Sequence, residues 1–255
     1  MAFFMGTIDS LVMELKTQLV AILPEYPDPE KPLKALYLLH GLRGNALSWV
    51  SDTSIERYVK DRNWAVIMPE VGRSFYQDMK YGPQYFTYVS EELPKICKNM
   101  FGLDPSRENT FVAGLSMGGY GALRIGLAKP DKFAALASLS GVTDIKAICQ
   151  MVAESDLKRE KNDFLAAIGS FDEIRPEIDI YHLLGEVEKL DGSQRPKIYL
   201  TCGKQDFLCP MNKAFNDRLK NSSVDFLYEE FDGDHVWAYW DFAIQRALDY
   251  FDSIA

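Results

Sequence analysis

Cysteine is sparse in this chain, and the few cysteines follow no metal-binding or disulfide pattern. There are four, Cys97, Cys149, Cys202 and Cys209. Their spacing fits no common zinc site, and a chain of 255 residues buries enough apolar surface to fold without disulfides. We therefore expect four reduced thiols, no metal and no cofactor, as in a cytoplasmic protein. A Cys202–Cys209 bridge is the alternative for an exported protein.

Long hydrophobic runs and clusters of positive charge are also lacking. No segment approaches the ~18 consecutive apolar residues that a membrane helix needs. The beginning of the chain has no basic residues typical of a secretory signal, and Asp9, Glu14 and Lys16 interrupt its apolar stretch. The net charge is −9, which disfavours binding to phosphate backbones. These absences argue against membrane and nucleic-acid partners, and they leave open whether the chain forms a homo-oligomer.

The chain contains short apolar runs that alternate with longer amphipathic segments, with no repeat or flexible linker between them. We therefore expect a single domain over residues 1–255. Most apolar runs are nearly continuous, which is typical of strands buried on both faces of a parallel sheet. The predicted strands are 3–8, 17–23, 35–39, 65–68, 110–113, 134–139, 198–201 and 224–231, and the predicted helices are 46–60, 84–100, 118–128, 211–220 and 237–251.

Residues 142–195 interrupt this alternation. The interval is too long for a simple crossover helix, so we expect a small cap insertion that walls a pocket. Its charged run, 156–161, is expected to form the solvated face of a helix. The predicted fold is α/β, with a mostly parallel central sheet, helices on both faces and this small cap insertion.

The strongest chemical motif is the G-x-S-x-G sequence from Gly114 to Gly118. It follows a predicted strand and opens a predicted helix, which is the setting of a nucleophile elbow. Such an elbow holds its serine in a strained conformation, and small residues two positions away relieve the crowding. We predict that Ser116 is a nucleophile, and a chance glycine-rich turn is the alternative.

Histidine is scarce, with only His40, His182 and His235. A serine hydroxyl needs an adjacent base to become a nucleophile. His235 lies between the last predicted strand and the last predicted helix, which fits the chain order serine, acid, histidine of nucleophile-elbow enzymes. We therefore predict His235 as the base. His182 falls in the predicted cap, where a solvated or structural role is expected, and His40 is placed to orient a loop by hydrogen bonding.

A carboxylate should fix the tautomer of the base and stabilise its protonated form. Asp206 follows the predicted strand 198–201 and is the preferred candidate. Asp234 adjoins His235, but neighbouring side chains rarely turn toward each other with the required geometry. Asp232 is a weaker alternative.

The reaction of a serine nucleophile also needs hydrogen-bond donors for the oxyanion of the transition state. We expect the backbone N–H groups of Met117, directly after the nucleophile, and of Leu42, in the glycine-containing loop after strand 35–39. The oxyanion loop, Ser116, Asp206 and His235 then each follow a different predicted strand, at the carboxyl edge where parallel sheets gather functional residues. Trp237, two residues beyond the predicted base, is expected to line the substrate pocket.

Several segments that carry these residues resemble the putative-esterase family of α/β-hydrolases, which includes tributyrin esterases, S-formylglutathione hydrolases (esterase D), acetyl-xylan and feruloyl esterases, and mycolyltransferases. The resemblance is greatest to the tributyrin-esterase branch. It implies the α/β-hydrolase fold, the triad Ser116, Asp206 and His235, and the oxyanion donors Leu42 and Met117. The segments are 36–45 (LYLLHGLRGN), 74–82 (SFYQDMKYG), 114–122 (GLSMGGYGA), 202–207 (CGKQDF) and 235–240 (HVWAYW).

The expected function is that of a serine carboxylesterase, which hydrolyses short acyl esters through an acyl-enzyme. Acetyl or butyryl esters, including esters of carbohydrates, are the expected small-molecule substrates, because the charged 142–195 interval offers no long apolar lid for a long acyl chain. A thioesterase of the S-formylglutathione hydrolase type and a feruloyl esterase are the alternatives. An acyltransferase and a non-catalytic binding protein on the same scaffold are more distant ones.

Overall fold

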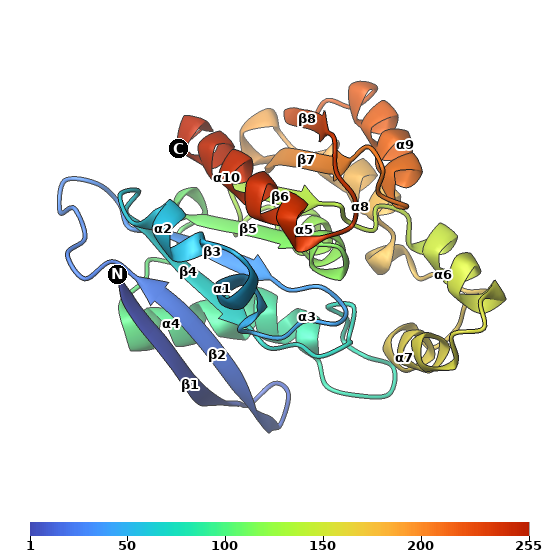
Figure 1. The fold of residues 1–255 in the computed structure, drawn as a ribbon, viewed down its shortest axis with the longest axis horizontal. Coiled ribbons are helices and arrows are strands. Elements are labelled where there is room, and N and C mark those ends of the chain that lie inside the picture. The colour runs from blue at the N-terminus through green and yellow to red at the C-terminus, as the bar shows by residue number, and fades with distance from the viewer. Residues whose placement is uncertain (255) are drawn as a thin grey trace.

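The central element is an eight-stranded sheet, seen in a computed structural model that describes residues 1–254 (Figure 1). Its strand order is β1-β2-β4-β3-β5-β6-β7-β8. The strands from β3 to β8 are parallel to one another, and β2 pairs antiparallel with both β1 and β4. Their bounds are β1 Ala2–Ser10, β2 Leu15–Leu23, β3 Lys34–Leu39, β4 Trp64–Pro69, β5 Thr110–Leu115, β6 Ala135–Leu139, β7 Lys197–Gly203 and β8 Phe226–Phe231.

The inner strands are apolar at nearly every position because helices cover both faces of the sheet. Successive side chains of a strand point to opposite faces. In β3, Leu36 and Leu38 contribute to one hydrophobic core, whereas Tyr37 and Leu39 contribute to the other. The predicted mostly parallel sheet with two covered faces is therefore confirmed.

Two sets of helices form the outer layers. The helices α1 (Ser48–Asp52), α2 (Ile55–Val59) and α10 (Trp237–Ile254) bury their apolar residues in one core. The opposite core receives residues of α4 (Leu93–Phe101), α5 (Met117–Ala128), α8 (Ile180–Val187) and α9 (Cys209–Lys220). A short helix α3 (Tyr85–Thr87) and a π-helical turn, Tyr88–Glu92, lead into α4.

The prediction of one helix over residues 46–60 is wrong, because the structure has two short helices there. Thr53 is extended between α1 and α2, and its hydroxyl donates to the carbonyl of Trp49. The N–H of Ser54 donates to the carboxylate of Asp241 in α10, at 2.9 Å. A contact with a distant helix therefore replaces the helical hydrogen bond at this point.

The interval between β6 and β7 contains three helices, and they differ in their surroundings. The helix α8 packs against α5 of the covering layer, whereas α6 (Ile145–Glu154) and α7 (Lys158–Ile168) extend beyond the sheet in Figure 1. The C-terminal part of this interval, which contains α8, therefore belongs to the covering layer. Only the α6–α7 segment, residues 145–168, stands where a cap would be.

The four cysteines are buried and free, so no Cys202–Cys209 bridge is formed. Burial raises the pKa of Cys97 and of Cys149 to about 12, which keeps both thiols protonated and unreactive at neutral pH. Within residues 1–254, no helix is long and apolar enough to cross a membrane.

Candidate active site

The turn between β5 and α5 is a strained strand-to-helix elbow. Ser116 has φ 54° and ψ −117°, outside the regions that side chains prefer. A Cβ on Gly114 would lie 2.4 Å from the carbonyl oxygen of Gly118, and a Cβ on Gly118 would lie 2.3 Å from the carbonyl oxygen of Leu39. Both positions therefore require glycine, which explains the motif sterically.

The elbow places Ser116 at the start of a hydrogen-bonded series with His235 and Asp206. The Oγ of Ser116 lies 2.9 Å from Nε2 of His235, and Nδ1 of His235 lies 2.8 Å from Oδ2 of Asp206. A carboxylate can only accept a hydrogen bond, so Nδ1 carries the proton and Nε2 is free to accept one. The three residues come from the β5–α5, β8–α10 and β7–α9 turns, and the structure brings them together at one edge of the sheet.

Asp206 is buried, and its surroundings keep it ionised. Burial alone would raise the pKa of this carboxyl group, but hydrogen bonds from His235, from the Leu208 N–H and from the Ser140 hydroxyl lower the pKa overall. The two oxygens have separate partners, because Oδ1 accepts from Leu208 N–H at 2.8 Å and Oδ2 faces His235. Ser140 itself has φ 48° at the end of β6, a strained position that sequence reasoning did not identify.

The other acidic and histidine candidates have different partners. Asp234 accepts a hydrogen bond from the backbone N–H of His235 at 2.7 Å, and Asp232 pairs with Lys204 at 3.1 Å. His182 is exposed and lies 3.9 Å from Glu186 in the same helix. None of these side chains contacts the imidazole of His235.

Two backbone N–H groups are available beside Ser116. Within residues 1–254, neither Leu42 nor Met117 donates its N–H to another residue. Met117 is the first residue of α5, so its N–H lies at the positive end of a helix. Gly41 lies close to the elbow, because a Cβ there would be 2.7 Å from the end of the Leu115 side chain and 3.6 Å from the Cβ of Ser116.

His40 holds the peptide that carries the Leu42 N–H. Its Nδ1 lies 2.8 Å from the carbonyl oxygen of Gly41, and since a carbonyl only accepts, Nδ1 is protonated. The N–H and the C=O of one trans peptide point in opposite directions, so fixing the Gly41 carbonyl also fixes the direction of the Leu42 N–H. The structure thus agrees with the expected loop-orienting position of His40.

The imidazole of His40 is neutral. Burial lowers its pKa, and Nε2 accepts a hydrogen bond from Val71 N–H at 3.3 Å. Glu70 lies 3.7 Å from the same nitrogen, but an Nε2 that accepts a hydrogen bond carries no proton and so forms no ion pair. Glu70 instead accepts from the N–H groups of Ala46 and Gly72.

The lowered pKa of His40 predicts a loss of stability in mild acid. The unfolded chain binds a proton at His40 near the ordinary value of about 6.5, before the folded protein does. The contribution of neutral His40 to the free energy of unfolding is therefore fully present above that pH. It decreases as the pH falls below that value, by at most about 1.4 kcal/mol per pH unit. Denaturant unfolding should be measured in parallel for the parent and for His40→Asn, whose amide can still donate to Gly41. The variant should show the weaker pH dependence, and equal slopes would contradict this account.

The aromatic rings next to His235 are those of Phe207 and Trp240, each at 4.8 Å between ring centroids. Trp237 is half-buried and packs edge-to-face against Trp49 and Trp240, at 5.4 and 5.3 Å between ring centroids. Phe207 lies 4.8 Å from the His235 ring and is 59% exposed. Sequence reasoning missed Phe207, although its position directly after Asp206 was a usable signal.

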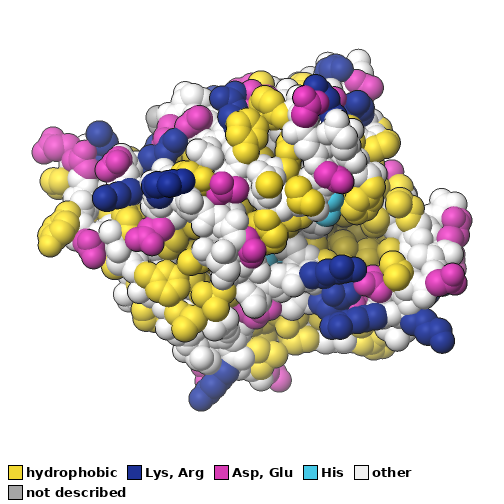
Figure 2. Space-filling view, in the orientation of Figure 1, with side chains coloured by type: hydrophobic (Ala, Val, Ile, Leu, Met, Phe, Trp, Pro, Cys, Tyr) yellow, Lys and Arg dark blue, Asp and Glu magenta, His cyan; other side chains and the backbone are white. Residues whose placement is uncertain are grey.

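A hollow opens beside a histidine side chain in the space-filling view, with hydrophobic side chains on its floor and Lys or Arg side chains along one rim (Figure 2).

The charged face of α7 is only partly solvated, contrary to expectation. Arg73 pairs with Glu160 at 3.5 Å and donates to the carboxylate of Asp163. The acidic residues of α7 therefore face the body of the protein.

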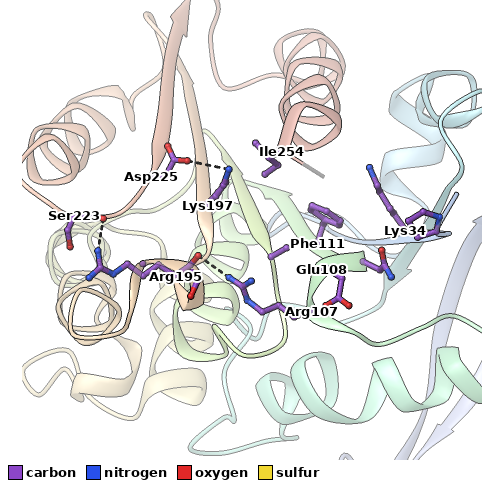
Figure 3. Close-up of a pocket in the computed structure, with 14 residues that line it drawn as sticks. Lys34, Arg107, Glu108, Phe111, Arg195, Lys197, Ser223, Asp225 and Ile254 are labelled. Carbon is purple, nitrogen blue, oxygen red and sulfur yellow. Dashed lines mark hydrogen bonds and ion pairs between the residues drawn. The ribbon is translucent and has the colours of Figure 1, made fainter.

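A separate cavity of about 520 Å³ lies at the opposite edge of the sheet, where the parallel strands begin (Figure 3). Its basic side chains have partners within the protein. Arg195 donates to the carbonyl of Ser223, Arg107 donates to the carbonyl of Arg195, and Lys197 pairs with Asp225. Since none of the predicted site residues lines it, this cavity is not the candidate active site.

The part of the chain that the structure describes, residues 1–254, contains no group of three or more His, Cys, Asp or Glu side chains that could hold a metal ion. The arrangement at Ser116 can instead perform chemistry with protein groups alone. It places a hydroxyl beside an imidazole of defined tautomer, near two N–H groups without an acceptor among the described residues, and these are the groups that acyl transfer needs.

The chain is similar over most of its length to known esterases. Residues 10–251 match the family model described as "Putative esterase". The acetyl esterase of Caldicellulosiruptor saccharolyticus is 33% identical, with all of both chains covered. Two Staphylococcus aureus structures are each 36% identical and cover 98% of both chains. They are the fluorophosphonate-binding serine hydrolase F, with a TM-score of 0.88, and an S-formylglutathione hydrolase, with a TM-score of 0.84. The chain therefore belongs to the putative-esterase family, as a serine esterase with the α/β-hydrolase fold.

Proposed function

We propose that this enzyme hydrolyses short acyl esters, with Ser116 as nucleophile, His235 as base and Asp206 as the acid that orients His235. The observation that carries the proposal is the pair of hydrogen bonds at 2.9 and 2.8 Å that joins these three side chains. Leu42 and Met117 are the proposed oxyanion donors.

The chemistry follows from these positions. His235 Nε2 takes the proton of Ser116 as Oγ attacks the ester carbonyl, and the N–H groups of Leu42 and Met117 hold the resulting oxyanion. The protonated His235, stabilised by Asp206, then gives its proton to the leaving alcohol. Water repeats the sequence on the acyl-enzyme, so that the acid is released and Ser116 regains its proton.

Short acyl groups are supported by the character of α7 and by the similarity to an acetyl esterase. A long acyl chain needs an apolar channel to leave water, at about 0.8 kcal/mol per buried methylene. The helix α7, which we propose to act as part of a cap within a single domain, has a polar flank where Glu160 and Asp163 bind Arg73. An S-formylglutathione hydrolase is the second candidate, because a structure with that name is 36% identical.

The surroundings of His235 favour a neutral alcohol over an anionic thiol such as glutathione. The leaving group departs next to His235, where Phe207 is exposed and apolar and where Asp234 adds negative charge. Phe207 could also stack on a phenolic or sugar group, which keeps feruloyl and acetylated carbohydrate esters within the proposed substrates. The buried free thiols support a cytoplasmic location.

Acetyl and butyryl esters should be hydrolysed with far higher kcat/KM than long-chain esters. The reason is that the flank of α7 where Glu160 and Asp163 bind Arg73 is polar and cannot compensate for additional methylenes. The measurement is kcat/KM for p-nitrophenyl esters of increasing acyl length, together with acetylated xylan, a feruloyl ester and S-formylglutathione. A maximum at decanoate or beyond would contradict the short-acyl proposal. A large preference for the glutathione thioester would move the assignment to the second candidate.

A further inference from the structure

Arg73 connects three segments that lie far apart in the sequence. It follows β4, its Nη1 donates to the carbonyl of Leu42 at 3.3 Å, and its Nε donates to the carboxylate of Asp163. Its Nη2 lies 3.5 Å from the carboxylate of Glu160. The side chains of Arg73, Glu160 and Asp163 are 18, 16 and 24% exposed, so this cluster is largely removed from water.

The positions of the three partners suit a guanidinium group. A planar fork with five donors can donate to the Leu42 carbonyl and the Asp163 carboxylate and still face the Glu160 carboxylate at ion-pair distance, which a lysine ammonium cannot do with the same geometry. Charge-assisted hydrogen bonds are also stronger where water is partly excluded. Arg73 therefore fixes its partners more firmly than a pair of exposed ions would.

The helix α7 also contacts the body through apolar side chains, since Phe164, Ala167 and Ile168 are buried in the hydrophobic core. The ring of Phe164 packs 4.2 Å from Phe75, and the carbonyls of Ala166 and Ala167 accept from the N–H groups of Tyr81 and Lys80. Within residues 1–254, every ion pair of α7 is made by Arg73. Arg73 thus links the first half of α7 to the loop that contains Leu42.

The contact with the Leu42 carbonyl complements the role of His40. His40 holds the peptide before Leu42, through the Gly41 carbonyl, whereas Arg73 holds the peptide after it. With both flanking peptides fixed, neither backbone torsion of Leu42 can rotate freely. The direction of the Leu42 N–H is then set before a substrate arrives, as effective oxyanion binding requires.

We propose that Arg73 is a positioning residue of the esterase reaction, which couples the oxyanion loop to α7 by binding Leu42, Glu160 and Asp163 together. This inference rests on the proposed role of Leu42 as an oxyanion donor. Removing such a donor outright costs about 10²–10³ in kcat, and displacing it by about 1 Å costs up to about 10². Arg73→Ala should therefore lower kcat roughly 10- to 100-fold and change KM for a short ester much less.

The test compares Arg73→Ala with Arg62→Ala, because Arg62 has the same kinds of partner elsewhere. Arg62 donates to the carbonyl of Tyr58 and to the carboxylates of Asp249 and Asp252, between α2 and α10. Arg73→Ala should lose at least as much thermal stability as Arg62→Ala, whose carboxylate partners are more exposed, but only Arg73→Ala should lose kcat and react more slowly with a fluorophosphonate. Arg73→Lys should recover a part of kcat. Equal kcat in the two alanine variants, or an effect of Arg73→Ala on KM alone, would overturn the proposal.

Hydrogen exchange provides a measurement that needs no substrate. In Arg73→Ala, exchange should rise in residues 41–44 and in α7, whereas Arg62→Ala should leave both segments unchanged. Unchanged exchange in Arg73→Ala would overturn the coupling even if the enzyme were active. If the parent protein hydrolysed none of the esters, the proposed function would fail, and the exchange result would still decide whether Arg73 couples the two segments.

Discussion

Ser116→Ala is expected to fold as the parent does and to lose ester hydrolysis by roughly 10³ to 10⁶. The loss follows because the only atom removed is the one that attacks the ester and donates to His235. The fold should persist because alanine and serine have the same Cβ, so the strain at φ 54° is unchanged. Turnover of p-nitrophenyl acetate, together with the thermal midpoint, measures both statements.

A control for this variant is Ser138→Ala, one strand away in β6. Within residues 1–254 the buried hydroxyl of Ser138 has no hydrogen-bond partner, so its removal should leave turnover near that of the parent. A fluorophosphonate should label the parent and Ser138→Ala but not Ser116→Ala. Near-normal hydrolysis by a folded Ser116→Ala protein would refute the mechanism.

The parallel sheet and the elbow could be predicted because they depend on local sequence. A strand covered on both faces must be apolar throughout, as in β4, and such runs are visible without any structure. The elbow needs glycine at two fixed positions around Ser116 because a Cβ would clash with backbone oxygen atoms. The spacing of the two glycines in the sequence therefore predicts the shape of the turn. The resemblance to a family of esterases added the roles of the residues beyond these turns.

The features that the sequence did not reveal depend on contacts between distant segments. The helix expected over 46–60 is broken where Ser54 binds Asp241, 187 residues away. The charged run 156–161 was expected to face water, but Glu160 pairs with Arg73, 87 residues away. A charge on a helix looks the same in the sequence whether its partner is water or a distant guanidinium, so only the structure distinguishes the two.

The placement of aromatic residues around His235 has the same origin. Proximity in sequence suggested Trp237 as a pocket residue, but its ring packs against Trp49 and Trp240 in the layer between α1 and α10. The role of Trp237 in binding substrate stays a prediction. Phe207 follows Asp206 in a turn, and its ring reaches His235 because the acid and the base are hydrogen-bonded.

Asp206→Asn is expected to reduce kcat by about 10⁴, the loss known when the acid of a serine triad becomes an amide. The two oxygens of Asp206 explain why. Oδ1 accepts from Leu208 N–H, so the amide oxygen of asparagine will keep this position and the NH₂ group will face His235. Nδ1 of His235 must then accept a hydrogen bond, which moves the ring proton to Nε2. An Nε2 that carries the proton cannot take one from Ser116.

Asp234→Asn is the matched control, and it should retain kcat within a few-fold of the parent. Asp234 only accepts a hydrogen bond from the backbone N–H of His235, and the amide oxygen of asparagine can accept the same bond. Both variants remove one negative charge near His235, so a general electrostatic effect would lower their activities alike. The measurement is kcat for a short ester, with thermal unfolding to show that both proteins are folded. The reverse ranking would assign the acid to Asp234, and equal large losses would show that charge near His235 matters more than the tautomer that Asp206 imposes.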